Sequence, residues 1–280
     1  MQIHDWIWTA TTWQVERYLL ISVPIFLVTV VLVHFALFRG KRQQRPWKAK
    51  ILRHELISSL VTSIVFGWAI IANALVGQAG YSTLYTEIDK YGYAFFLLSF
   101  PVGLMIHDAY FYWCHRWLHT VKFLRRFHAA HHKSRNPSAL ASLSFSPVEA
   151  AIHASFSVFY LTLIPVHPYP FMFITTMYLV SSTLGHTGIE LYPKWFARHF
   201  ITKHLATPTH HDLHHQFGGY NYALYFTWWD RLLKTEHPDY LRHVDDGVSR
   251  KPSTNEKLLP SIEHSSILTA LFKRLDRTTR

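Results

Sequence analysis

The chain has 280 residues, 49% of them hydrophobic and 16% aromatic, so it is long and apolar enough to bury a core. Its one cysteine, Cys114, excludes a disulfide framework and a metal site built from cysteines. The formal net charge of +11 can indicate nucleic-acid binding. Long apolar runs between the basic stretches favour a membrane protein instead.

The apolar runs follow one another along the chain. Residues 18–38 and residues 56–76 carry no formal charge, and 21 residues of helix span roughly 30 Å, the thickness of the hydrocarbon core. A third run, residues 93–113, is interrupted only by His107 and Asp108. The first run follows no signal-peptide pattern, so it is expected to be a retained helix.

Two further apolar stretches, residues 150–166 and 168–185, are short for complete spans and meet at His167 and Pro168. They are expected to form a helical hairpin that enters and leaves the membrane on one side. The sequence therefore predicts an all-α, integral membrane helical bundle of about four transmembrane helices, or three plus a helical hairpin. A helical cap on the cytoplasmic side is expected to hold the metal site described below.

Basic residues predict the orientation of this bundle. Residues 39–53 contain seven lysines and arginines, whereas the segment before the first run carries only Arg17, near the expected membrane edge. The positive-inside rule places residues 39–55 in the cytoplasm and the N-terminus outside. A second basic segment, residues 116–135, follows the third run on the same side. Everything from residue 186 onward is then cytoplasmic as well.

Histidines gather in two windows of the sequence. Of 21 in the chain, five lie in residues 115–132 and seven in residues 186–215. Each window contains an H-x-x-H-H pattern, which is expected about 0.1 times by chance at this histidine frequency. The first window also contains H-x-x-x-H, and both windows are predicted to lie on the same side of the membrane. Three such patterns together predict metal binding.

The spacing indicates two metals rather than one. Helical residues three or four apart share a face, so His115 and His119 can reach one ion together. Adjacent His131 and His132 point in different directions and are expected to serve different ions, and the same holds for His214 and His215. Eight imidazoles in these patterns exceed what one ion can hold. Imidazole suits zinc, copper, iron and nickel, so ligand type alone leaves the metal open.

The motifs and their order resemble the fatty acid hydroxylase and sterol desaturase superfamily of membrane di-iron oxidoreductases. The H-x-x-x-H pattern and the two H-x-x-H-H patterns, called here the first, second and third histidine boxes, carry the resemblance. It rests also on the flanking segments 108–116, 146–149 and 221–231, and on Gly185-His186-Thr187-Gly188. It covers residues 100–237, close to half of the chain. The flanks of the third box look closer to the sterol-modifying branch than to the acyl-chain hydroxylases.

The resemblance implies a set of ligands and a reaction. It implies two iron ions and O2 as co-substrate, with external electrons, in the hydroxylation of an unactivated C–H bond of a sterol-like or acyl lipid. A separate electron-donor protein, a haem or iron–sulfur carrier with its reductase, is expected as partner, and no fused haem domain is found. The ligands it assigns are His115, His119, His128, His131, His132, His186, His211, His214 and His215.

Other polar residues near the boxes are candidates for supporting roles. Ligating histidines commonly donate their second ring N–H to a carboxylate, and the candidates for this role are Asp108, Glu149, Asp212 and Asp230. A salt bridge to Arg231 or a helix cap is an equally plausible role for Asp230. His210 and His107 are weaker ligand candidates, and Glu190 is expected at the surface.

Three alternatives to lipid hydroxylation stay open. A sterol-type desaturase would introduce a C=C bond with the same irons and O2. A metal transporter would line an ion path with histidines, and a non-catalytic protein would keep the metal for structure. The expected domain organisation is 1–90 for the N-terminal helices and basic loop, 91–240 for the catalytic region and 241–280 for a polar tail, with a short amphipathic helix at 267–275.

Overall fold

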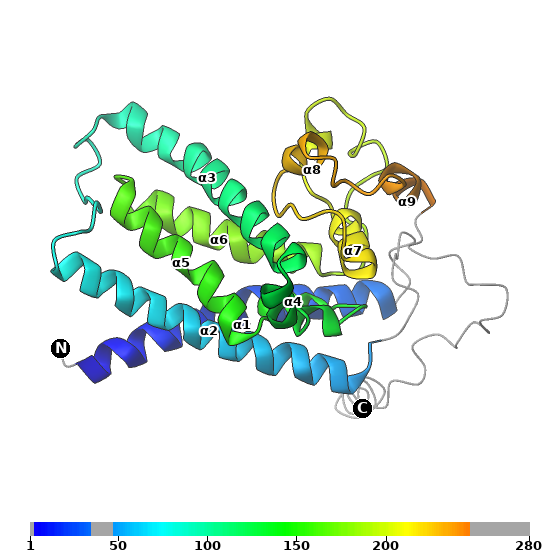
Figure 1. Ribbon diagram of the computed structural model, residues 1–280, viewed down its shortest axis with the longest axis horizontal. Coiled ribbons are helices and arrows are strands. Elements are labelled where there is room, and N and C mark those ends of the chain that lie inside the picture. Colours follow the sequence, from blue (N-terminus) through cyan, green and yellow to red (C-terminus); the bar gives the residue numbers. More distant parts are fainter. Residues whose placement is uncertain (1–2, 35–46, 247–280) are drawn as a thin grey trace, which may run out of the picture.

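The computed structural model describes residues 3–34 and 47–246, which form a bundle of long helices with a smaller helical region at one end (Figure 1). The long helices are α1 (Ile3–His34), α2 (Ala49–Gln78), α3 (Tyr93–Thr120), α5 (Pro147–Leu163) and α6 (Pro168–Gly185). The described residues contain only helices, turns and two isolated β-bridges. The predicted all-α membrane bundle is confirmed.

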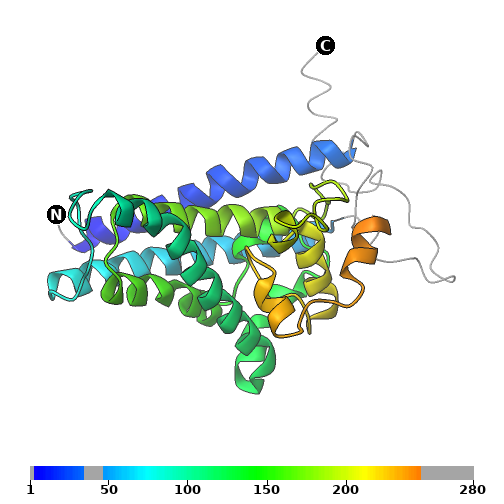
Figure 2. The same cartoon turned by 90° about the horizontal axis from the view of Figure 1, so that it is seen from above.

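Three of these helices, α1, α2 and α3, are long and apolar enough to cross a membrane. Helix α1 packs against α2 and α6, α5 packs against α2 and α3, and α6 also packs against α3. Helix α5 has 17 residues and α6 has 18. The arrangement is therefore three candidate spans with a helical pair beside them, and Figure 2 shows the same bundle from above.

The first span differs from its prediction. Helix α1 begins at Ile3, and its apolar segment runs from Asp5 to Val33 rather than over residues 18–38. Apolar residues such as Trp6 and Ile7 continue the helix toward the N-terminus, because no glycine or proline interrupts residues 3–17. Arg17 consequently lies inside the helix rather than at its edge.

Helix α2 also begins within a predicted loop. It starts at Ala49, so the last part of the basic segment 39–55 is helical, and residues 39–46 lie outside the described residues. The tail beyond residue 246, including the expected amphipathic helix at 267–275, lies outside them as well. Before it, α9 (Tyr240–Asp246) crosses the expected boundary at residue 240.

A buried segment between the second histidine box and α5 is held by hydroxyl groups of the long helices. It contains the short 3₁₀ helix η2 (Ala139–Leu143), whose five residues are all buried. Tyr18 of α1 and Ser59 of α2 both donate to the carbonyl of Leu140, and Ser182 of α6 donates to the carbonyl of Ser142. These bonds satisfy backbone groups away from water and fix the segment against three helices.

The remaining elements form the region at the end of the bundle. They are α4 (Lys122–His128), η1 (His131–Lys133), η3 (Thr202–His204), α7 (Pro208–Phe217) and α8 (Trp228–Leu232), together with α9. Local sequence sets the limits of α7: Thr207 caps its first turn, Pro208 occupies the first helical position, and Gly218 ends it with a φ of 65°.

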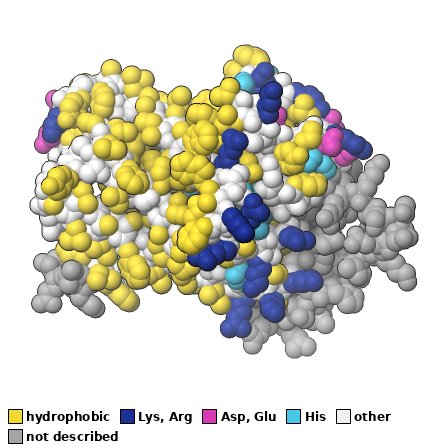
Figure 3. All heavy atoms as spheres, in the orientation of Figure 1, with side chains coloured by type: hydrophobic (Ala, Val, Ile, Leu, Met, Phe, Trp, Pro, Cys, Tyr) yellow, Lys and Arg dark blue, Asp and Glu magenta, His cyan; other side chains and the backbone are white. Residues whose placement is uncertain are grey.

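The surface divides in the same way as the fold. Figure 3 shows hydrophobic side chains over much of the part formed by the long helices, while lysines and arginines gather toward the end with α4 and α7. Lys122, Arg125 and Arg126 of α4 are exposed. An apolar belt beside a basic region is typical of a membrane protein whose basic end lies in water or among lipid headgroups.

Candidate metal centre

The first two histidine boxes lie on the end of α3, on α4 and on η1. His115 and His119 are one turn apart near the end of α3, so they share a face. His128 is the last residue of α4, and η1 then begins at His131. Within η1 adjacent residues point in different directions, which separates His131 from His132.

The other four predicted ligands come from α6 and α7. His186 is the residue directly after α6, and α7 carries His211, His214 and His215. His211 and His215 are four residues apart and share a face, whereas His214 lies on the neighbouring face. All three are buried, as is His186.

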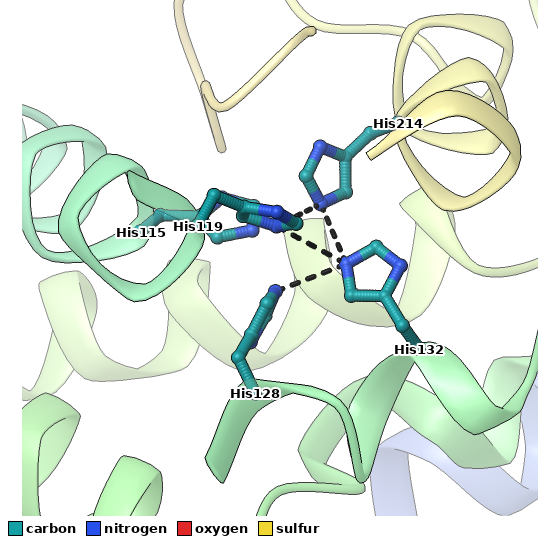
Figure 4. A group of neighbouring side chains, drawn as sticks. All are labelled: His115, His119, His128, His132 and His214. Atoms are coloured by element: carbon teal, nitrogen blue, oxygen red, sulfur yellow. Dashed lines mark hydrogen bonds between the residues drawn. The ribbon is translucent and has the colours of Figure 1, made fainter. Parts of the chain in front are cut away.

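The structure brings all nine predicted histidines together, in two groups. The nitrogens that can act as ligands lie within 4.8 Å of one another in each group. The five-histidine group, drawn in Figure 4, consists of His115, His119, His128, His132 and His214. The four-histidine group consists of His131, His186, His211 and His215. The adjacent histidines of each H-x-x-H-H pattern therefore belong to different groups.

The rings are oriented by hydrogen bonds from Nδ1. In the five-histidine group, His115 donates to the carbonyl of Tyr222 at 2.8 Å and His214 to that of Tyr220 at 2.7 Å. The Nδ1 of His128 lies 2.6 Å from a Glu149 oxygen. A carbonyl oxygen can only accept, so Nδ1 of His115 and His214 carries the hydrogen and Nε2 of the neutral ring carries the lone pair.

The same orientation occurs in the four-histidine group. There, Nδ1 of His186 contacts the Ser182 carbonyl at 2.6 Å, and Nδ1 of His215 contacts the Ser134 carbonyl at 3.1 Å. His131 contacts the carbonyl of Ser144 at 3.3 Å. The Nε2 lone pairs of all three rings are therefore free for another interaction.

These lone pairs face one another at short range. His186 Nε2 lies 3.1 Å from His215 Nε2 and 3.3 Å from His131 Nε2, and none of the three carries a hydrogen in the neutral ring. In the five-histidine group, His132 Nε2 lies 3.0 Å from Nε2 of both His128 and His214. Two nitrogens that ligate one metal at about 2.1 Å and at right angles are about 3.0 Å apart. Both groups therefore fit a metal cation at their centres.

Burial keeps these rings in the ligating, neutral form. It lowers the pKa of His132 to about 3 and that of His186 to about 4. The pKa values of His131, His211 and His215 lie well below the usual value, first because of burial and then because neighbouring histidines repel a second charge. A metal binds the deprotonated ring, so no proton needs to be displaced at neutral pH.

An apolar cavity borders the four-histidine group. It has a volume of about 190 Å³ and lies between α3, α6, the start of α7 and residues 223–226. His211 lies in its wall, together with apolar side chains such as Leu104, Met177 and Leu224. An apolar molecule in this cavity would therefore lie beside a metal at the four-histidine group.

Comparison with known proteins agrees with this geometry. Residues 100–235 match the family model described as fatty acid hydroxylase, a range that contains all nine histidines. A Delta(7)-sterol 5(6)-desaturase of Gibberella zeae is 28% identical over 207 residues, which cover 74% of this chain and 62% of that protein. Human lathosterol oxidase is 30% identical over 173 residues, 58% of this chain and 53% of that protein.

The chain is similar to the fatty acid hydroxylase and sterol desaturase superfamily over residues 100–235, just under half of its length. It spans between about half and about three fifths of the length of the two relatives just described. No solved structure matches it.

Of the four acidic residues expected to support the nine histidines, Glu149 contacts one of them, His128. Asp108 instead accepts from the backbone of Tyr225 and Phe226 and from the Trp228 indole. Its role is to hold the loop after α7 against α3.

Asp230 also holds the loop after α7, whereas Asp212 accepts a hydrogen bond from within α7. Asp230 accepts at 2.9 Å from the backbone N–H groups of Tyr222 and Ala223, so it fixes the peptide whose carbonyl orients His115. The arginine that follows Asp230 pairs with Glu236 instead. Asp212 accepts from the side chain of Gln216, one turn along α7.

The weaker ligand candidates lie outside both groups. His210 is fully buried with Nε2 3.4 Å from Asp230, and His107 contacts the Tyr225 hydroxyl at 2.8 Å. The expectation of a surface position for Glu190 is wrong: it is 7% exposed and accepts from the backbone and hydroxyl of Thr209 at the start of α7.

One important residue was missed by the sequence reasoning. Asn221 has a φ of 59°, in the left-handed region, and lies between the two residues whose carbonyls orient His214 and His115. Its amide donates to the His210 carbonyl and its oxygen accepts from the His237 N–H. Asparagine tolerates this conformation better than most residues. An asparagine shortly after Gly218 and Gly219 was therefore the sequence signal for a left-handed backbone conformation.

Proposed function

We propose that the protein is a membrane-bound sterol desaturase that holds two iron ions, one in each histidine group. The observation that carries this proposal is the pair of buried groups whose Nε2 lone pairs converge beside an apolar cavity. The sterol desaturases and sterol oxidases among the relatives support desaturation over the hydroxylation favoured by the sequence alone. Neutral imidazoles suit iron but also other metals, and the family match supports iron among them.

The protein's own part in the reaction is positioning and exclusion of water. The cavity beside His211 would receive the apolar body of the substrate, with Leu104 and Met177 of the membrane helices on one side. Substrate would enter from the bilayer between α3 and α6, because both helices contribute to the cavity wall. Buried surroundings keep competing water away from the oxidised carbon.

The bound irons would supply the redox chemistry with O2. Removal of two hydrogens from adjacent carbons, together with two external electrons, two protons and one O2, gives a C=C bond and two molecules of water. The two electrons must come from a donor, which we propose is a separate haem or iron–sulfur carrier with its reductase. The exposed basic residues of α4 support a cytoplasmic location for this end, in line with the positive-inside rule.

Hydroxylation remains the second candidate, since the same histidines would serve it. It inserts one oxygen atom and consumes the same two electrons. A metal transporter is less consistent with the geometry, because the nine histidines form two closed groups rather than a series across the spans.

The test combines metal analysis with product analysis. The full chain, purified in nanodiscs, is expected to contain about two irons and to convert a Delta(7)-sterol only when O2 and a reducing system are present. Mass spectrometry would show loss of two hydrogens for desaturation and gain of one oxygen for hydroxylation. Conversion without O2, or zinc in both groups of an active preparation, would contradict the proposal.

A further inference from the structure

Arg17 lies within a candidate membrane span. It is twelve residues beyond Asp5, where the apolar segment of α1 begins, and 12 × 1.5 Å places it about 18 Å along the helix. Charged side chains within membrane spans are costly unless they are paired, and they mark functional sites by default. Arg17 therefore requires an explanation that packing alone does not give.

The side chains that contact the Arg17 guanidinium are all neutral. Its guanidinium donates to Gln14 at 3.2 Å and to the hydroxyls of Thr175 and Thr176 at 3.4 and 3.3 Å. It also lies over the ring of Trp13, 4.5 Å from the centroid. Within residues 3–34 and 47–246, no carboxylate forms an ion pair with it. The described residues therefore orient the positive charge without neutralising it.

A second apolar cavity opens beside this guanidinium. It has a volume of about 110 Å³ and is lined by Arg17 and by one face each of α2, α5 and α6. On α2 the lining residues run from Phe66 to Asn73, seven residues or about 10 Å. Trp13 and Met172, which also line it, are 39% and 47% exposed, so the cavity opens at the surface that faces lipid.

A second polar group points to a ligand in this cavity. Tyr178 is 7% exposed and lines the cavity, and its hydroxyl has no hydrogen-bond partner. It lies three residues after Thr175 on α6, so it is one turn from a residue that contacts Arg17. A buried hydroxyl is normally satisfied, so this one is open to a ligand in the cavity.

We infer that this cavity is a binding site for a single-chain anionic lipid. Its carboxylate would accept from Arg17, with Tyr178 as a second donor, and its alkyl chain would lie against Phe66 and the other apolar lining residues. An anion completes the ion pair that the protein leaves open, which a neutral alcohol of the same length cannot do.

The site is separate from the metal centre. None of the nine histidines lines it. His153, which does line it, stacks on Phe111 at 5.0 Å and packs near Phe145, and these two rings in turn contact His115 and His131. A layer of aromatic rings thus lies between the two sites, and the inference does not depend on the reaction proposed above.

The test measures binding to the full chain in phosphatidylcholine nanodiscs. The probes are radiolabelled oleate, the alcohol of the same chain, and a single-chain phosphate monoester. Arg17→Met is expected to weaken oleate binding about tenfold, and Tyr178→Phe to weaken it less. Arg17→Lys should restore part of the affinity. Arg53→Met, which removes an exposed charge from α2, is the matched control and should change nothing.

The outcomes separate an anion site from a structural arginine. Preference for oleate over the alcohol, lost in Arg17→Met, supports the inference, and tighter binding of the phosphate monoester would support it with phosphate as the headgroup. Equal binding of acid and alcohol by the unaltered protein would overturn it, as would unchanged oleate binding by Arg17→Met. If Arg17→Met does not fold, Ala69→Phe, which fills the cavity, must abolish binding.

Discussion

The two histidine groups are built from the same residue type but are supported differently. In the five-histidine group, His128 is oriented by the Glu149 carboxylate and two other rings by carbonyls of the loop 220–222. In the four-histidine group, the three observed Nδ1 partners are backbone carbonyls of Ser134, Ser144 and Ser182. The first group depends on a side chain and a loop, and the second on backbone fixed by the long helices.

Their surroundings differ as well. His119 and His132 of the five-histidine group are partly exposed, whereas all members of the four-histidine group are at most 9% exposed. The four-histidine group also borders the cavity through His211. Under the proposed function, the metal of the five-histidine group would lie nearer to the protein surface and that of the four-histidine group nearer to the substrate.

The largest expected effect is the loss of a ligand from either group. His211→Ala leaves three histidines in its group, whereas His119→Ala leaves four in the other. Each variant is expected to lose more than about 100-fold in sterol conversion, and His211→Ala to lose the larger share of bound metal. Metal analysis of the purified variants, with activity assays, measures both effects.

The control for ligand loss is His199→Ala, which removes an exposed histidine outside both groups. It should keep full metal content and activity. A His211→Ala protein that still holds two metals per chain and remains active would show that the four-histidine group is not a metal site.

The next effect tests the carboxylate that distinguishes the groups. Glu149→Gln keeps an oxygen for His128 but removes the negative charge, and loss of such a partner typically costs 10- to 100-fold in metal affinity or activity. The loss should appear in one metal equivalent and not in the other. Glu55→Gln is the matched control, because Glu55 is equally buried but its carboxylate accepts from Ser138. Equal losses in both variants would contradict a specific role.

A smaller effect is expected at Asp230. Asp230→Asn replaces an acceptor of two backbone N–H groups by one oxygen and one donor, which disturbs the Tyr222 peptide that orients His115. We expect about a tenfold loss in metal affinity of the five-histidine group alone. Glu236→Gln, a partly buried acid in the same region that pairs with Arg231, controls for loss of charge. Weakening of both metals alike would refute the assignment of Asp230 to one group.

The histidine boxes could be predicted because their spacing is local. Adjacent residues of a helix do not face each other, so the separation of His131 from His132 was readable in advance. The supporting partners were not readable, because Ser144, Ser182 and Tyr220 contribute backbone carbonyls, which every residue has. Their roles depend on long-range packing rather than on residue type.

The start of α1 failed as a prediction for a related reason. A search for uncharged runs ends at Glu16 and Arg17, since it assigns every charge to water. In the structure, Arg17 is held by threonines of α6, 158 and 159 residues away, which no local pattern reveals. A charged residue inside a span can therefore be recognised only when the packing of the helices is known.

The smallest expected effect concerns the spacing between α6 and α7. A Cβ at Gly185 would lie 3.4 Å from the His211 ring, an ordinary contact, and the backbone there is helical. Gly185→Ala should therefore raise the melting temperature slightly, because alanine favours helix over glycine, while metal content stays unchanged. Gly185→Val adds two methyl groups toward His211 and should weaken metal binding by the four-histidine group only. If valine is tolerated as well as alanine, the close approach of α6 to His211 is not what fixes that ring, and the four-histidine group is less rigid than its backbone partners indicate.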